Sequence, residues 1–145
     1  MYTEYQPSHL LVPYIDSYWE FKGNPDYGMR IHILPDGCTD FIFTLGEVAN
    51  AVEEGSLIMQ PYRSYFVGPM TKYSELVTYT ESIHMFGVRF LPCGLSCFTN
   101  LPLHEFVNSR VSTNEMKAVF DDTFIEKLGE QKHVTDRIRV CLLYT

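Results

Sequence analysis

Polar and apolar residues alternate in short segments through the first 100 residues of the chain. Residues 30–34 alternate between polar and apolar up to Ile33, and residues 40–45 form a short apolar run that ends before Gly46. Segments of this length, rich in β-branched and aromatic residues and separated by Pro, Gly and Asp turns, are typical of strands in a sandwich or barrel. Several are apolar on both faces, which favours a barrel that packs on its outside against a further layer. The strands predicted between residues 15 and 92 are 30–34, 40–45, 64–67, 75–80 and 83–90.

The spacing of apolar residues becomes helical after residue 100. Residues 112–115 form a capping box, the signature of a helix N-terminus, in front of apolar residues at helical spacing. Asp121 and Asp122 suit the positive start of a second helix, and Gly129 is placed as its C-cap. Thr135 is placed to cap a third helix. The predicted fold class is therefore mainly β with C-terminal helices.

Composition and charge restrict the classes that this domain can belong to. Lys and Arg number 11 and Asp and Glu number 18, so the net charge is −7, without the basic surface that grips a phosphate backbone. The best candidate for a recognition helix, residues 136–144, offers only Arg137 and Arg139 for reading bases, so we expect no DNA contact by this chain alone. We expect a barrel in residues 1–100, with a short helical turn at 8–12, and a helical segment in residues 101–145.

The start of the chain does not read as a leader peptide. It lacks a basic region and is interrupted by Pro7, Pro13 and Asp16. No apolar run approaches the ~20 residues that a membrane span needs. We therefore expect a cytoplasmic protein with four reduced cysteines and no membrane partner. The third predicted helix is still apolar at Thr145, so we expect the natural protein to continue.

Five short motifs follow one another along the chain. They are LVPYIDSYW (residues 11–19), ILPDGCTDFIF (33–43), FVGP (66–69), FGVRFLP (86–92) and LPLHEF (101–106). In this order and spacing they resemble the N-terminal sensor domain of AraC-type bacterial transcription regulators. The resemblance covers residues 7–143.

The resemblance to AraC-type regulators carries its own expectations. It implies a cupin-like barrel that senses an effector, helices used for dimerisation, and a C-terminal domain with two helix-turn-helix motifs that binds DNA and is absent from this sequence. Glycine is usual in that family at the position of Cys93, so the turn after Pro92 is expected to differ.

Histidines and cysteines give little support for a metal site or for catalysis. The five histidines stand singly, and a His-x-His pair of the kind that binds metal in cupins is missing. His32 and His84 lie on different predicted strands and could meet inside the barrel, or they are core residues held by hydrogen bonds. Cys93 and Cys97 are spaced more widely than in most zinc ribbons. We expect no enzyme, no catalytic residue, no metal and no cofactor.

A charged pair in apolar strands is the strongest candidate for a binding site. Asp40 and Arg89 must pair if they are buried, and an ion pair between them would fix the strand register. Alternatively, Arg89 holds an anionic or polar effector, helped by Arg30 and His32, which share one strand face, and by stacking on Trp19. The candidate effector-binding residues are Trp19, Arg30, His32, Asp40, His84 and Arg89.

Apolar residues in the helical segment raise the question of assembly. A barrel that is closed by its own aromatic residues cannot also bury the apolar side chains of Phe120, Phe124, Ile125 and Leu128. Apolar surface that is left over in this way predicts a homodimer held by helices of residues 113–145. The rival interpretation is that these residues cover the outer wall of their own barrel.

The sequence as a whole predicts an effector-sensing and dimerisation domain of an AraC-type regulator. Effector binding would favour one state of the barrel and so shift the helices that carry the DNA-binding half. The alternatives are a small stand-alone cupin-like ligand-binding barrel or enzyme, and a pure oligomerisation module whose interior is filled by side chains.

Overall fold

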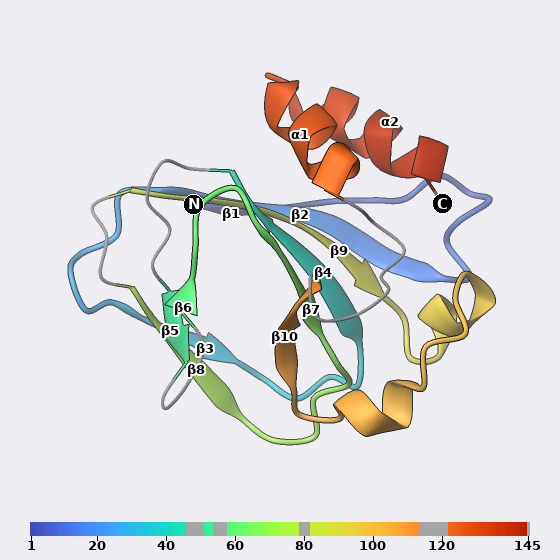
Figure 1. Cartoon of the computed structure of the whole chain (residues 1–145), viewed down its shortest axis with the longest axis horizontal. Coiled ribbons are helices and arrows are strands. Elements are labelled where there is room, and N and C mark those ends of the chain that lie inside the picture. Colours follow the sequence, from blue (N-terminus) through green and yellow to red (C-terminus); the bar gives the residue numbers. More distant parts are fainter. Residues whose placement is uncertain (46–50, 54–57, 79–81, 114–121, 145) are drawn as a thin grey trace.

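A computed structural model of the chain describes residues 1–45, 51–53, 58–78, 82–113 and 122–144. Among these residues, the strands form two antiparallel sheets (Figure 1). The six-stranded sheet has the order β1 (Tyr2–Tyr5), β2 (Ile15–Gly23), β9 (Ile83–Phe90), β4 (Thr39–Thr44), β7 (Ser64–Val67) and β10 (Arg110–Ser112). The four-stranded sheet has the order β3 (Arg30–Ile33), β8 (Ser74–Thr78), β5 (Ala51–Glu53) and β6 (Ile58–Met59). The helical elements are the 3₁₀ turns η1 (Gly94–Cys97) and η2 (Leu103–Phe106) and the helices α1 (Asp122–Glu130) and α2 (Val134–Tyr144).

This arrangement confirms the predicted fold class, mainly β followed by C-terminal helices. The predicted strands at 40–45 and 83–90 agree with β4 and β9 to within a residue. The predicted strands did not include β2, β5 and β6, nor β1 and β10, which are the two edge strands of the larger sheet. Edge strands are short and bury little, so they lack the apolar pattern that identifies a central strand.

The six-stranded sheet is the middle layer of the molecule, with an apolar cluster on each face. Side chains alternate across a strand, so Tyr18 and Trp19 on β2 point to opposite faces. We call the face that packs on the four-stranded sheet the inner face, and the opposite one the outer face. The inner-face cluster contains Trp19, Ile42, Met59, Tyr65, Val67, Met70, Ile83 and Met85, with Ile31 and Ile33 of β3 packed against it.

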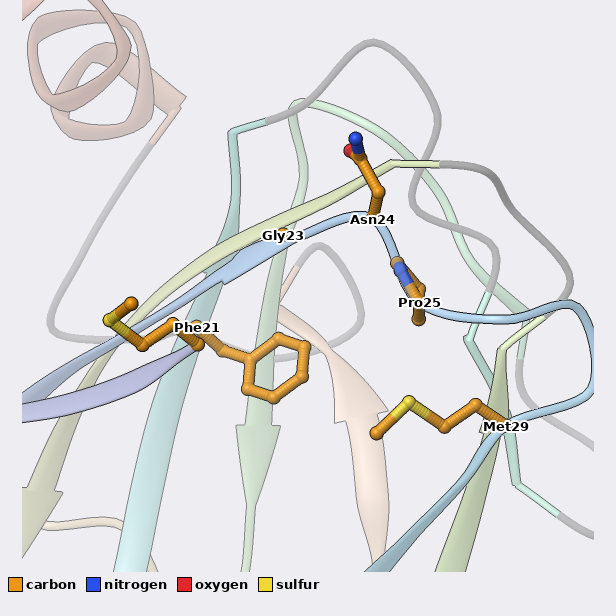
Figure 2. Close-up of a pocket in the computed structure, with 6 residues that line it drawn as sticks. Phe21, Gly23, Asn24, Pro25 and Met29 are labelled. Carbon is orange, nitrogen blue, oxygen red and sulfur yellow. The ribbon is translucent and has the colours of Figure 1, made fainter.

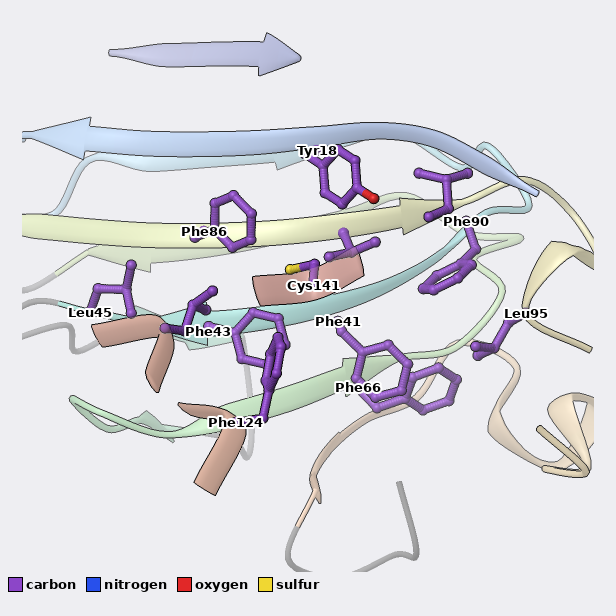
Figure 3. Close-up of a cluster of buried hydrophobic side chains, with 13 residues drawn as sticks. Tyr18, Phe41, Phe43, Leu45, Phe66, Phe86, Phe90, Leu95, Phe124 and Cys141 are labelled. Atoms are coloured by element: carbon purple, nitrogen blue, oxygen red, sulfur yellow. The ribbon is translucent and has the colours of Figure 1, made fainter. Parts of the chain in front are cut away.

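The outer face is covered by the C-terminal helices (Figures 1 and 3). Phe124 and Leu128 of α1 and Cys141 of α2 are at most 1% exposed, and the rings of Phe124 and Phe43 lie 5.0 Å apart. Removing one such side chain from water contributes about 2–3 kcal/mol. Phe124 and Leu128 therefore cover the wall of their own barrel, as the rival interpretation expected, and need no partner chain for burial. Phe120 and the side chain of Ile125 lie outside the described residues.

The helix boundaries differ in detail from those predicted. Gly129 lies inside α1, which ends at Glu130, and Thr135 lies inside α2, which begins at Val134. The carbonyl of His133 accepts the amides of Asp136 and Arg137, so α2 begins before the predicted cap. Most of the helix predicted after the capping box at 112–115 falls outside the described residues. The segment 8–12 forms a hydrogen-bonded turn, with two amides bonded to the Ser8 carbonyl.

The turn after Pro92 places Cys93 in a backbone conformation that glycine favours. Cys93 has φ 63° and precedes η1 in the left-handed conformation. This conformation costs a residue with a Cβ about 1 kcal/mol, whereas glycine adopts it freely. The backbone of this turn is therefore of the kind that glycine fits, although the sequence places a cysteine there.

Candidate functional site

The six candidate residues fall into three separate groups. Three of them, Trp19, Asp40 and Arg89, meet on the inner face of the larger sheet and are called the inner cluster. Arg30 and His32 lie on the solvent side of the smaller sheet. His84 lies on the outer face, where it contacts Glu20 and Arg137, and these three form the outer cluster.

The inner cluster is built from three adjacent strands. Asp40 on β4 lies directly opposite Arg89 on β9, and Trp19 comes from β2 on the other side of β9. Trp19 Nε1 donates a hydrogen bond of 2.8 Å to Asp40 Oδ1, and Arg89 Nε lies 3.4 Å from the same oxygen. The predicted ion pair between Asp40 and Arg89 is confirmed, and the hydrogen bond that Asp40 Oδ1 accepts comes from the indole N–H of Trp19.

Gly87 positions the indole of Trp19. The two residues are opposite each other on β9 and β2. A Cβ at Gly87 would lie 2.1–2.5 Å from atoms of the indole, closer than any real contact. A glycine is therefore required here because the ring lies directly against the strand backbone. An isolated glycine inside a strand is the one sequence signal that pointed to this close approach.

The N-terminal strand adds two residues that the sequence did not reveal. Glu4 Oε1 lies 3.3 Å from Arg89 Nη1, and Tyr2 Oη lies 3.4 Å from Arg89 Nη2. Asp36 Oδ2 lies 3.8 Å from Arg89 Nε. The guanidinium already faces carboxylates at these positions, so an anionic effector bound to Arg89 would compete with Glu4. The ring of Tyr2 lies 5.9 Å from that of Trp19.

Burial makes ionisation of the Asp40 carboxyl unfavourable. Burial raises the pKa of Asp40 to about 6, although Arg89 and the Trp19 N–H both favour the ionised form. For Arg89, burial opposes the charged form, but Asp40 and Tyr2 raise the guanidinium pKa above its usual value. A buried carboxyl that titrates near neutral pH beside a fixed cation is a feature of functional sites.

Arg30 and His32 share one face of β3, as predicted, but this face is exposed. Their side chains are 62% and 59% exposed, and the inward positions are taken by isoleucines. Arg30 Nη1 donates to Glu75 Oε2 at 2.8 Å, Tyr73 Oη donates to Glu75 Oε1 at 2.7 Å, and His32 contacts Tyr73. Hydrogen bonds from Tyr73 and Arg30 lower the pKa of Glu75. The structure does not bring this group to the inner cluster.

The outer cluster joins the sheet to α2. Glu20 Oε1 accepts hydrogen bonds from Arg137 Nη1 at 2.6 Å and from His84 Nε2 at 2.7 Å. Glu20 and Arg137 are 117 positions apart, and no sequence signal connected them. His84 therefore does not meet His32 inside the barrel, because the two point away from the inner face on different sheets.

A small pocket lies between the end of β2 and the start of β3 (Figure 2). Its volume is about 210 Å³, below the ~300 Å³ at which ligand pockets usually begin. Phe21 connects it to the inner cluster, since Phe21 and Trp19 share one face of β2. The residues that line it are Met1, Phe21, Gly23, Asn24, Pro25 and Met29.

The described residues show no group of metal-binding side chains and no helix that could span a membrane. Within that part of the chain, no three His, Cys, Asp or Glu side chains are grouped so that they could hold a metal ion. Neither α1 nor α2 has the length and apolar character needed to cross a lipid bilayer.

A comparison with protein-family models identifies the family of the chain. A family model described as a domain of unknown function, DUF6597, matches residues 3–112. The chain belongs to the DUF6597 family. The DUF6597 match runs from β1 to β10, so it contains the whole inner cluster together with Glu20 and His84, whereas Arg137 lies beyond it. A search of curated proteins gave no match.

Proposed function

We propose that this chain is the effector-sensing and dimerisation domain of a cytoplasmic AraC-type transcription regulator, whose DNA-binding helix-turn-helix domain lies outside these residues. The assignment to AraC-type regulators in this proposal rests on the five motifs that resemble the AraC-type sensor domain. One observation of the structure carries it. Trp19 and Glu20 are neighbours on β2, and the first holds Asp40 on the inner face while the second holds Arg137 of α2 on the outer face.

This adjacency supports a route from ligand to helix. A polar ligand that takes over the hydrogen bond between Trp19 and Asp40 would shift the side chain of Trp19 and the strand that carries it. The same strand holds Glu20, so the position of α2 would respond. An effector acts in this way only if it binds one arrangement better than the other. The domain works by binding in this proposal, with no chemical step.

The proposed homodimer uses the helical segment. Phe124 and Leu128 are not available to an interface because the chain's own sheet covers them. The interface of the proposed homodimer is therefore formed by the other apolar side chains within residues 113–145. Light scattering at rising micromolar concentration tests this point. A mass that approaches twice the 16.8 kDa of one chain supports the dimer, and a mass that stays at 16.8 kDa contradicts it.

Fluorescence tests the sensing role, because Trp19 is the only tryptophan of the chain. Sugars, amines and carboxylates are titrated while Trp19 emission and the melting temperature are recorded. We expect an effector to change both in the native protein and in Glu75→Gln, a control on the exposed sheet. Both effects should disappear in Asp40→Asn. A bound compound whose effects survive Asp40→Asn would contradict the proposed site.

A stand-alone ligand-binding barrel is the second candidate, and the pocket beside Phe21 favours it. Its lining is largely apolar, so its ligand would be small and apolar. Substitution of Met29 by Trp fills this pocket while the inner cluster stays intact. A compound that stabilises Asp40→Asn but not Met29→Trp would favour this candidate over the regulator.

A further inference from the structure

Arg137 fastens α2 to the rest of the molecule. Its Nη1 donates to Glu20 Oε1 on β2 at 2.6 Å, and its Nη2 donates to the carbonyl of Gln131 at 2.9 Å, directly after α1 ends. The residue is only 6% exposed, so its charge depends on the partners within the cluster. One side chain therefore connects α2, the end of α1 and the six-stranded sheet.

Within the part of the chain that the structure describes, His84 and Arg137 share one carboxylate, that of Glu20. His84 Nε2 donates to Glu20 Oε1 at 2.7 Å and lies 3.2 Å from Arg137 Nη1. Neutral His84 fits this geometry, because its N–H and the guanidinium both donate to one oxygen. Burial and the Arg137 charge lower the pKa of His84, while Glu20 opposes them.

Among the described residues, Glu20 is the one carboxylate that faces His84, and Arg137 already shares it, so protonation of His84 would add a second cation to the same carboxylate. The other described charged group that faces it is Lys22, which lies opposite His84 on β2 and is also a cation. On the neighbouring strand the residue bonded to the His84 carbonyl is Leu45, which is apolar. Among the described groups, the carboxylate of Glu20 would then balance the cations of both His84 and Arg137, whose nitrogens lie 3.2 Å apart, and like charges this close in a partly buried site repel strongly.

We propose that Glu20, His84 and Arg137 form a pH-sensitive latch, in which protonation of His84 releases α2 from the outer face of the sheet. The latch does not depend on the ligand of the inner cluster or on DNA binding. Release uncovers the apolar cluster of Figure 3, where Cys141 of α2 lies 1% exposed. The Cys141 thiol is therefore a built-in reporter of the latch.

Pulsed alkylation of the whole chain with N-ethylmaleimide, read by mass spectrometry, tests this proposal. Labelling of Cys141 is divided by that of exposed Cys97, which corrects for the general fall of thiol reactivity at lower pH. We expect this ratio to rise by up to about tenfold between pH 7.5 and 5.5, because a histidine released from the cluster regains an ordinary pKa near 6.5 and its protonation over this range favours the released state. Labelling of Cys38, a buried thiol at the start of β4, should not rise, because the sheet stays folded.

Three variants complete the test. His84→Gln keeps a donor for Glu20 but cannot take a proton, so its ratio should stay low at both pH values. His133→Gln removes an exposed histidine beside the start of α2 and should behave like the native protein. Arg137→Gln should give a high ratio already at pH 7.5. If circular dichroism shows that His84→Gln does not fold, His84→Asn replaces it.

Several results would overturn the latch. These are a Cys141 ratio that is independent of pH, a rise that persists in His84→Gln, and a rise of Cys38 together with Cys141, which means global unfolding. A low ratio in folded Arg137→Gln at pH 7.5 would also exclude it. None of these results bears on effector binding, which the fluorescence of Trp19 tests separately.

Discussion

The inner and outer clusters are chemically alike and structurally different. Each joins a carboxylate, an arginine and a ring N–H: Asp40, Arg89 and Trp19 in the inner cluster, and Glu20, Arg137 and His84 in the outer cluster. The inner partners lie on strands that are already paired by backbone hydrogen bonds. The outer partners join a sheet to a helix that no backbone ladder holds in place.

This difference decides what each cluster does for stability. Helices of 9 and 11 residues are marginal in water by themselves, so α1 and α2 depend on packing and on the Arg137 contact. The residues of the inner cluster instead lie on strands that backbone hydrogen bonds pair without any help from the cluster. The desolvation of Asp40 makes this cluster electrostatically unfavourable. Loss of an outer partner should therefore affect structure, and loss of an inner partner should mainly affect electrostatics.

The largest effect is expected at the outer cluster. Substitution of Arg137 by Ala leaves Glu20 partly buried without its charge partner and should lower the free energy of unfolding by about 3 kcal/mol. Arg139→Ala is the matched control on the same helix, since Arg139 is 78% exposed, and it should cost about 0.5 kcal/mol or less. Urea denaturation monitored by circular dichroism measures both. Equal effects of the two substitutions would show that α2 is not held by the outer cluster.

Two glycine substitutions should change the free energy of unfolding in opposite directions. Gly87→Ala forces the indole of Trp19 away from the strand and should cost about 2 kcal/mol, with a change in tryptophan emission. Gly129→Ala meets open space inside α1 and should stabilise the protein by about 0.5–1 kcal/mol. Thermal unfolding followed by fluorescence distinguishes them. An unchanged emission spectrum in Gly87→Ala would mean that Gly87 does not position the indole.

The effect of Arg89→Ala should depend on pH. The pKa of Asp40 is about 6 in the folded protein and near 4 in the unfolded chain, so the folded state binds more protons and native stability falls as pH rises from 4 to 6. Without Arg89 the pKa of Asp40 rises further, and native stability continues to fall above pH 6.

We therefore expect Arg89→Ala to cost about 2 kcal/mol at pH 8 and clearly less at pH 5, where Asp40 is protonated in both proteins. Denaturant midpoints at the two pH values measure this difference. A cost that is the same at both would mean that Arg89 does not act through the Asp40 charge.

The smallest effect is expected on the exposed sheet, where a similar set of residue types lies in water. Arg30→Ala removes a contact of 2.8 Å to Glu75, yet it should change the free energy of unfolding by about 0.5 kcal/mol or less. A larger loss would show that burial is not what separates the inner and outer clusters from this group.

The sequence by itself determined the local features of this protein. Alternation along the strands placed Arg89 opposite the apolar face of Phe86 and Val88, and the charge rule for buried strands paired it with Asp40. Helical spacing placed Phe124 and Leu128 on one apolar side of a helix. These features depend only on where successive Cβ atoms point, so they are encoded within a few residues.

Only the tertiary structure decided which of these local surfaces meet. Arg30 and His32 share a face, but the packing of the two sheets turned that face to solvent. Glu20 found Arg137 because α2 folds back over the sheet that contains β2. Such contacts depend on the order of strands and on helix docking. Their residues are far apart in the chain, and short-range periodicity carries no information about them.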